Sequence, residues 1–267
     1  MESIEHSDSH FRPTPGVPPA GQGSVAPPDY FRQQPHLPAS TPARDPGDGY
    51  DARITWKTGM LGIAFAFGSV LVLGIFFAIA LALGADEDNH TFNFAANLAQ
   101  DLLLVGAALL AVRTVVDRVT PETLGFRGLR WSGVGWAALA LVLFLIISAV
   151  YASLIHIDQE NVKDSGLGGP LLVIFAVAIA PVVEETFFRG FLFRSFRNGL
   201  GVIGAAILTG LLFGSVHAGS APATALPLLA LFGVMLALLF EQTRSLWPCI
   251  LLHMSYNALV MISVLAS

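Results

Sequence analysis

The chain of 267 residues is 54% hydrophobic and only 12% charged, and its mean hydropathy is +0.66. Soluble domains carry about a quarter charged residues, so this composition excludes an ordinary soluble globular protein. The net charge of -5, without any block of Lys and Arg, also excludes nucleic acid as a partner. The single cysteine, Cys249, excludes an internal disulfide and a cysteine-based metal cluster within one chain.

The first 57 residues differ sharply in composition from the rest. They hold 12 of the 33 charged residues (14 Lys or Arg plus 19 Asp or Glu) and 10 of the 16 prolines. Such a segment cannot bury enough apolar surface to offset the entropy lost on ordering, and it lacks the apolar stretch of a secretory signal. We therefore expect residues 1–55 to form a disordered, Pro-rich cytoplasmic tail, and the first apolar segment after it to remain as a membrane anchor.

Long apolar segments follow the tail, each close to the roughly 20 residues that a helix needs to cross a bilayer. None of them alternates as a strand does, and no repeat is evident. The sequence therefore predicts an all-α fold, a polytopic bundle of about seven transmembrane helices. The expected spans are residues 59–84, 93–115, 132–155, 169–188, 202–218, 223–240 and 246–266.

The distribution of Lys and Arg predicts the orientation of these spans. With a cytoplasmic N-terminus, 13 of the 14 Lys and Arg residues fall on the cytoplasmic side, and only Lys163 lies outside. This is a strong positive-inside bias. We expect an integral protein of the plasma membrane of a bacterial-type cell, with its N-terminus inside and its C-terminus outside.

Ionisable residues within a span are costly in lipid, which makes them functional candidates. The fourth expected span contains Glu184, Glu185 and Arg189. Glu185 and Arg189 are four residues apart with the acid first, the favourable order for an ion pair along one helix face. Glu184 lies about 100° around the helix and stays less neutralised. A purely structural role for both acids is the alternative, but one pair suffices for it and a second buried carboxylate is expensive.

Two later spans each contain a histidine. Phe213 and His217 share one helix face, and so do His253 and Asn257, because the members of each pair are four residues apart. A lone histidine in an apolar helix is more often a hydrogen-bonded structural group. Two histidines together with a carboxylate pair in neighbouring spans instead indicate a site.

A turn-like stretch, residues 198–201, lies midway between the first glutamate and the first of these histidines. If the chain reverses there, Glu184 and His217 stand at the same height, each about 25 Å from the turn. His253 then reaches the same pocket from a third helix. Pro181 removes a backbone hydrogen bond one turn before Glu184, so we expect a kink that opens space for water.

The second span carries a polar stripe of Asn93, Asn97, Gln100 and Asp101. Asn97 and Asp101 share a face and the other two flank it, so we expect the stripe to face inward. Because no histidine is nearby, we interpret it mainly as a source of interhelical hydrogen bonds, with lining of a substrate site as the second interpretation.

A carboxylate, two imidazoles and an amide with access to water suit hydrolysis. Glu184 can act as the general base, and His217 can orient or share the water. His253 and Asn257 can donate hydrogen bonds to the oxyanion of a tetrahedral intermediate. Alternatively, Glu184, His217 and His253 can hold Zn²⁺ with one open coordination position. Both alternatives stay open at this point.

Cys249 lies on the same helix face as His253 and Asn257, at intervals of four residues. Residues stacked along one helix diverge along its axis, so the three cannot converge on a substrate as a cysteine-protease triad does. We expect Cys249 to be a small packing residue.

The motifs Glu184-Glu185-x-x-x-Arg189, Phe213-x-x-x-His217 and His253-x-x-x-Asn257, in this order, resemble the three motifs of the CPBP family. That family contains CAAX prenyl proteases of the Rce type and bacterial Abi-type bacteriocin-processing or immunity proteins. The resemblance extends over roughly residues 168–263.

The resemblance implies an intramembrane endopeptidase in which Glu184 and His217 activate water. Its substrate would be a peptide or protein cleaved at the membrane, with CAAX-type processing as one case. Glu185, Arg189, His253 and Asn257 complete the implied site. The implied organisation is a set of N-terminal transmembrane helices in residues 56–165, followed by a catalytic core in residues 166–267.

Two other functions would use the same features. A non-catalytic bacteriocin-immunity or scaffold protein would bind a partner in this pocket, and Glu184→Gln would leave its function intact. A proton-coupled transporter would use the buried Glu and His residues as relays, although the missing inverted repeat counts against it.

Overall fold

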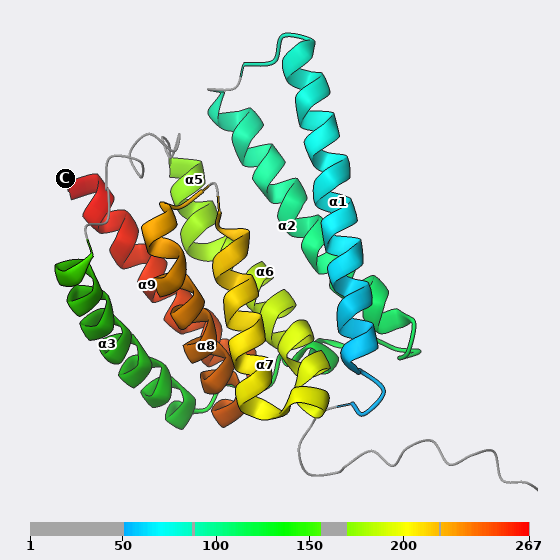
Figure 1. The fold of residues 1–267 in the computed structure, drawn as a ribbon, viewed down its shortest axis with the longest axis vertical. Helices are drawn as coiled ribbons and strands as arrows, with labels where there is room; N and C mark the ends of the chain where they lie inside the picture. The colour runs from blue at the N-terminus through cyan, green and yellow to red at the C-terminus, as the bar shows by residue number, and fades with distance from the viewer. Residues whose placement is uncertain (1–50, 87–88, 156–169, 219, 267) are drawn as a thin grey trace, which may run out of the picture. The chain divides into compact units, whose positions relative to one another are not determined.

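The computed structural model describes residues 51–86, 89–155, 170–218 and 220–266, and within these ranges it contains helices and no β-strand (Figure 1). The predicted all-α fold is therefore confirmed for the described part of the chain, whereas all of the predicted tail except residues 51–55 lies outside it. The elements, in order, are α1 (Trp56–Ala82), α2 (His90–Arg113), η2 (Pro121–Leu124), α3 (Trp131–Leu154), α5 (Pro170–Ile174), η3 (Phe175–Ile179), α6 (Ala180–Glu185), η4 (Thr186–Phe193), α7 (Arg194–Val216), η5 (Ala223–Ala225), α8 (Leu226–Thr243) and α9 (Leu246–Ala266).

Local sequence signals account for several helix ends. Asn89 is the N-cap of α2, because its side-chain oxygen accepts hydrogen bonds from the backbone amides of Thr91 and Phe92, each at 3.0 Å. Pro227 stands in the first turn of α8, where a missing backbone donor costs nothing. Arg244 ends α8 with a left-handed φ of 55°, so the chain turns and α9 begins two residues later.

Six helical segments are long and apolar enough to cross a membrane, and the fourth of them, Phe175–Val216, runs for 42 residues. That is about twice the length a bilayer requires. Gly201 interrupts it with a φ of 67° and a ψ of 176°, a conformation outside the helical region that glycine adopts most readily. Divided at Gly201, the described chain has the predicted number of spans, about seven.

The helices on the two sides of Gly201 form the expected hairpin. Phe188 and Phe213 are at nearly the same distance from the turn in sequence, and their rings meet edge to face with centroids 5.2 Å apart. The predicted chain reversal at residues 198–201 is therefore confirmed.

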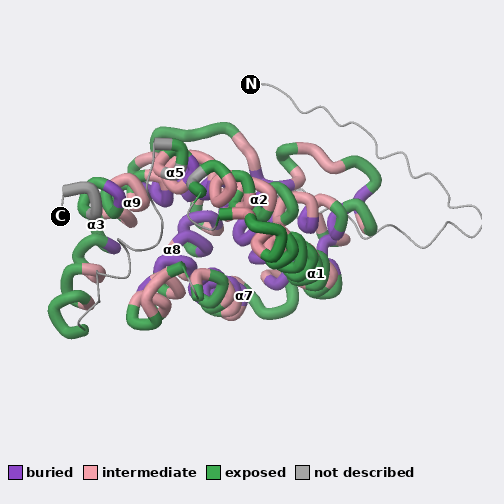
Figure 2. The backbone as a smooth tube through the Cα atoms, turned by 90° about the horizontal axis from the view of Figure 1, so that it is seen from above, coloured by how far each residue is buried: buried purple, intermediate pink, exposed green. Residues whose placement is uncertain are grey.

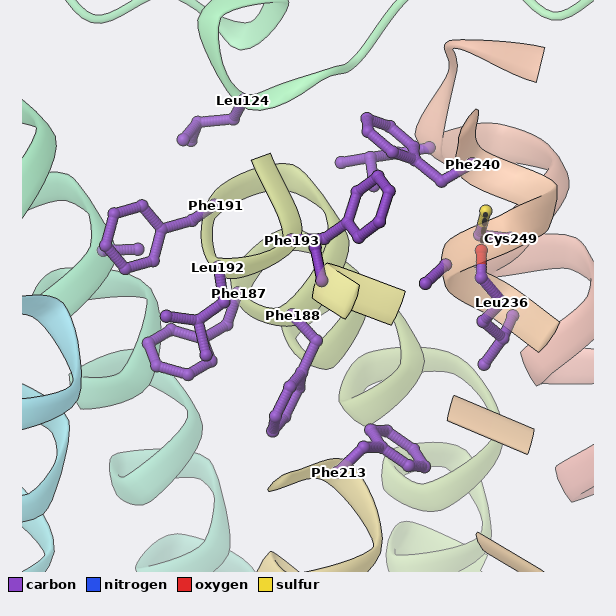
Figure 3. Close-up of a cluster of buried hydrophobic side chains, with 14 of the residues drawn as sticks. Leu124, Phe187, Phe188, Phe191, Leu192, Phe193, Phe213, Leu236, Phe240 and Cys249 are labelled. Carbon is purple, nitrogen blue, oxygen red and sulfur yellow. Dashed lines mark hydrogen bonds between the residues drawn. The ribbon is translucent and has the colours of Figure 1, made fainter. Parts of the chain in front are cut away.

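The helix that carries the two glutamates runs through the centre of the bundle. All eight residues of η4 are buried, as expected for a helix enclosed by other helices. Its aromatic rings point in different directions (Figure 3): Phe188 toward Phe213, Phe193 toward Phe240, and Phe191 toward the side where α1 and α2 lie. By contrast, α1 and α3 present exposed apolar side chains along most of their length, as lipid-facing helices do (Figure 2).

Glycines allow α7 and α8 to approach closely. A Cβ atom on Gly210 would lie 2.7 Å from the carbonyl oxygen of Ala230, and one on Gly214 would lie 2.8 Å from that of Leu226. From the opposite helix, a Cβ on Gly233 would lie 2.8 Å from Gly210 Cα. Gly210-x-x-x-Gly214 is the small-residue spacing that favours close helix pairs in membranes, and it holds the backbone of α8 near the centre of the bundle.

Gly210→Ala is expected to lower the thermal midpoint of the detergent-solubilised protein. The added methyl group would meet backbone atoms, and such overpacking costs about 1–3 kcal/mol. Gly68→Ala in α1 is the matched control, because a Cβ there meets nothing within 4 Å. Since alanine is the better helix former, the control should keep or raise the midpoint. Equal shifts in the two variants would contradict close packing at Gly210.

Candidate active site

Glu185, the last residue of α6, is the centre of a buried charged group. The side chains of Glu185 and Arg189 have no exposed surface, and Arg189 Nη1 donates a hydrogen bond to Glu185 Oε1 at 2.9 Å. Arg189 Nη2 donates a second one to the carbonyl oxygen of Gly233 in α8 at 3.0 Å. The guanidinium carbon also lies 4.6 Å from the centroid of the Phe213 ring. The predicted ion pair is confirmed, and it joins the central helix to both α7 and α8.

His253 of α9 contacts both glutamates of the first motif. Its Nδ1 lies 2.9 Å from Glu185 Oε1, and its Nε2 lies 3.9 Å from Glu184 Oε2. The carboxylate paired with Arg189 is an acceptor, so His253 Nδ1 carries the hydrogen and donates it. In the neutral ring, Nε2 then presents its lone pair toward Glu184.

Glu184 differs from its neighbour in having no ion-pair partner at hydrogen-bond distance among the described residues. Its side chain is 19% exposed, whereas its Oε2 atom is buried and receives no hydrogen bond from the described part of the chain. Glu185 Oε2 is in the same state, but that carboxylate is held through its other oxygen. A buried acceptor without a donor costs about 1–3 kcal/mol, and such an atom in a polar site calls for a water, a substrate or an ion.

His217 directly follows α7 and is half-buried. Its Nδ1 lies 2.7 Å from the carbonyl oxygen of Phe213. Because a carbonyl oxygen only accepts, Nδ1 carries the hydrogen, and the neutral ring keeps a lone pair on Nε2. That atom can accept a proton or a hydrogen bond from a water molecule.

Phe213 brings the three motifs together. Its fully buried ring has its centroid 4.8 Å from the His217 ring and 5.7 Å from the His253 ring, in addition to its contact with Arg189. A single aromatic side chain therefore lies against a charged or polar residue from each motif. The expectation that His253 reaches the same region from a third helix is confirmed.

Asn257 donates a hydrogen bond to a backbone carbonyl that has no helical partner in the segment preceding the glutamates. In the π-helical turn η3, the backbone amide of Ala180 donates to the carbonyl of Phe175, five residues earlier. In the same register, the carbonyl of Ala176 would accept from the backbone amide of residue 181. That residue is Pro181, which has no amide hydrogen. Asn257 Nδ2 donates to the Ala176 oxygen at 2.8 Å. The backbone irregularity expected at Pro181 is present as a π-helical turn, and α9 stabilises it.

This bond bears on the expected role of Asn257 as an oxyanion donor. It uses one of the two amide hydrogens and holds the side chain against η3. The second amide hydrogen is the one that an oxyanion would need. Sequence spacing shows that Asn257 shares a face with His253, but not that a proline on another helix leaves a carbonyl opposite it.

The second span contributes Asp101 to this region. Asp101 is 8% exposed, its Oδ2 has no hydrogen-bond partner among the described residues, and it interacts electrostatically with Glu184. Asn97 and Gln100 are exposed, and Asn97 Nδ2 donates within α2 to the carbonyl of Asn93. The prediction that the whole stripe faces inward is therefore wrong: Asp101 is its buried member, because α2 turns only one edge of the stripe toward α6.

The expected zinc ligands are Glu184, His217 and His253. Within the ranges that the structure describes, no three His, Cys, Asp or Glu side chains lie close enough together to hold a metal ion. The donor set as arranged therefore does not match a three-ligand zinc site.

Cys249 behaves as a packing residue. It is fully buried, and its Sγ lies 3.5 Å from the carbonyl oxygen of Leu236 in α8. A buried sulfur held against a backbone carbonyl fills space between α8 and α9, in agreement with the prediction.

Asn257→Leu is expected to lower the free energy of unfolding by about 1–3 kcal/mol, because the carbonyl of Ala176 loses its donor. In a Pro181→Ala background, the new amide at position 181 can serve that carbonyl. The same Asn257→Leu change should then cost less than half as much in a thermal or denaturant melt. Additive effects of the two substitutions would show that Asn257 does not compensate for the proline.

Comparisons with known proteins agree with this site. Residues 165–259 match the family described as Type II CAAX prenyl endopeptidase Rce1-like, and this segment contains all three motifs. The chain is also similar to "Putative membrane peptidase YdiL" of Bacillus subtilis (strain 168), at 24% identity over 218 residues that cover 78% of this chain and 87% of that protein. No solved structure matches the chain. The predicted resemblance to the CPBP proteases is confirmed: residues 165–259 are similar to the Rce1-like endopeptidases, and the chain is similar to a named membrane peptidase over most of its length.

Proposed function

We propose that this chain is an intramembrane endopeptidase that hydrolyses a peptide bond with a water molecule activated by Glu184 and His217. The observation that carries the proposal is the difference between two adjacent glutamates. Glu185 is neutralised by Arg189 and bonded to His253, whereas Glu184 has no ion-pair partner at hydrogen-bond distance among the described residues. The family of residues 165–259 is described as an endopeptidase, and the Bacillus relative as a membrane peptidase, which supports the same conclusion.

In the proposed reaction, Glu184 accepts a proton from the water as the water oxygen attacks the carbonyl carbon of the peptide. His217 Nε2 accepts a hydrogen bond from the other hydrogen and orients the attack. When the tetrahedral intermediate collapses, the C–N bond breaks and Glu184 returns its proton to the leaving amine. The products are a carboxylic acid and an amine, and Glu184 is again a carboxylate.

In this proposal His253 and Asn257 stabilise the oxyanion, and Glu185 and Arg189 position His253. Glu185 fixes the ring of His253 through Nδ1, and Arg189 fixes Glu185. His253 donates through Nε2 to the oxyanion when its ring is protonated, together with the second amide hydrogen of Asn257. Arg189 and Glu185 thus act through His253 and are positioning residues.

The substrate in this proposal is a peptide or protein cleaved at the membrane, and a CAAX-type prenylated protein is the case that the family description suggests. The proposal includes the orientation predicted from Lys and Arg, with the N-terminus cytoplasmic and the chain in the plasma membrane.

Glu184→Gln is expected to reduce kcat by at least about 100-fold, because removing a general base costs about 10²–10⁴ in rate. The assay uses the full-length protein in liposomes with a farnesylated peptide ending in a CAAX sequence and with its non-prenylated twin. Glu241→Gln is the matched control, since Glu241 pairs with Arg197 and Arg244 away from the three motifs. Turnover by Glu184→Gln equal to that of the control would refute the proposal and favour a binding or immunity function.

Metal analysis accompanies the assay. Glu184, His217 and His253 as arranged do not form a zinc site, so cleavage should persist in chelator, whereas cleavage that a chelator abolishes and added zinc restores would contradict the proposed reaction. Full cleavage in chelator by protein without bound metal would support the glutamate-dependent mechanism.

A further inference from the structure

Asp101 is a buried carboxylate that the proposed reaction does not use, and it lies outside the segment that matches the protease family. It is more than nine-tenths buried, and its Oδ2 atom has no hydrogen-bond partner in the described ranges. Holding such an atom without a donor is unfavourable, so a purely structural role does not explain it.

The helix that carries Asp101 packs against the helix that carries Glu184 and Glu185. Helix α2 packs against α6 and η4, and Phe94 of α2 meets Phe175 of η3 edge to face with centroids 5.9 Å apart. Asp101 interacts electrostatically with Glu184. The unpartnered oxygens of these two residues therefore belong to neighbouring helices in contact.

The neighbouring polar residues extend this feature along α2. Asn97 and Gln100 are exposed within a helix long and apolar enough to span a membrane. Amide side chains within a membrane-spanning helix are costly when they lack polar partners, so a polar ligand that covered this edge of α2 would stabilise it. From Asn93 to Asp101 the polar edge rises about 12 Å, the length of three or four residues of extended peptide.

An extended peptide in a membrane needs hydrogen-bond acceptors for its backbone amides. A protease must bind its substrate with the scissile bond accessible, and an unwound segment within a membrane has backbone amides that lack acceptors. The buried acceptor of Asp101 and the amides of Asn97 and Gln100 match such a backbone. A charged acceptor bonded to a backbone amide is among the stronger hydrogen bonds.

We propose that the polar edge of α2, residues 93–101, binds the backbone of an extended peptide substrate, and that Asp101 Oδ2 accepts a hydrogen bond from a backbone amide next to the scissile bond. This inference rests on the proposed function, because it identifies how the same site holds its substrate.

The test measures peptide affinity in a Glu184→Gln background, where the peptide binds without turnover. The probe is a fluorescent farnesylated peptide ending in a CAAX sequence, with full-length protein in liposomes. Asp101→Leu should raise Kd about 10- to 100-fold, as expected for loss of a hydrogen bond to a charged group. Asp101→Asn keeps an acceptor oxygen but loses the charge, so it should recover part of the affinity and bind more tightly than Asp101→Leu. Asp117→Asn, the same chemical change at an exposed position beyond α2, should have no effect.

A second series replaces one backbone N–H at a time by oxygen around the scissile bond of the peptide. One such ester should lose affinity with the Asp101 protein, and the same ester should lose nothing with Asp101→Leu. The thermal midpoint of Asp101→Leu should be unchanged or higher, whereas a structural role would lower it. Unchanged Kd in Asp101→Leu, or an equal ester effect in both proteins, overturns the inference. Tight peptide binding without any cleavage by the wild-type protein would instead contradict the proposed function alone.

Discussion

The Glu185 carboxylate lies in the interior of a membrane bundle with no exposed surface, and the surrounding structure holds this one charge through its Oε1 atom. Arg189 neutralises it from the same helix, and His253 donates a hydrogen bond to it from α9. The carbonyl of Gly233 in α8 accepts a hydrogen bond from Nη2 of the same guanidinium. Removing one partner of such a group leaves an uncompensated charge, at a cost of about 3–5 kcal/mol. The packing of three helices therefore depends on it, and so does the close α7–α8 contact at Gly210 and Gly214 that supports Gly233.

The same arrangement separates the roles of two adjacent acids. A rotation of about 100° per residue turns Glu184 away from Arg189 while leaving it 3.9 Å from the far nitrogen of His253. One histidine thus connects a carboxylate that Arg189 neutralises to one that has no cation at hydrogen-bond distance in the described part of the chain, and each carboxylate keeps one unsatisfied buried oxygen. Native structures concentrate such unsatisfied groups at functional sites, where stability is given up for chemistry. Asp101 adds a further unsatisfied oxygen from a helix outside the family segment.

Much of this could be predicted from helical spacing alone. Apolar length predicts the all-α bundle, residues 198–201 predict the hairpin, and four-residue spacing predicts the Glu185–Arg189 pair. The bond from Arg189 to Gly233 could not be predicted, because it depends on how closely two helices pack, although Gly210-x-x-x-Gly214 was a usable signal for it. The burial of Asp101 beside exposed Asn97 follows from which edge of α2 meets α6, and the bond from Asn257 to Ala176 follows from a π-helical register. Neither is encoded in the periodicity of a single helix.

The division of roles between the two glutamates is tested most directly by comparing the thermal midpoints of Glu184→Gln and Glu185→Gln in one detergent. Glu185→Gln leaves Arg189 as an uncompensated buried charge, so it should lower the midpoint strongly. Glu184→Gln removes a carboxylate that has no cation paired with it at hydrogen-bond distance, so its midpoint should stay at or above that of the wild-type protein. A midpoint for Glu184→Gln as low as that for Glu185→Gln would contradict the account, because both acids would then be parts of one structural ion network.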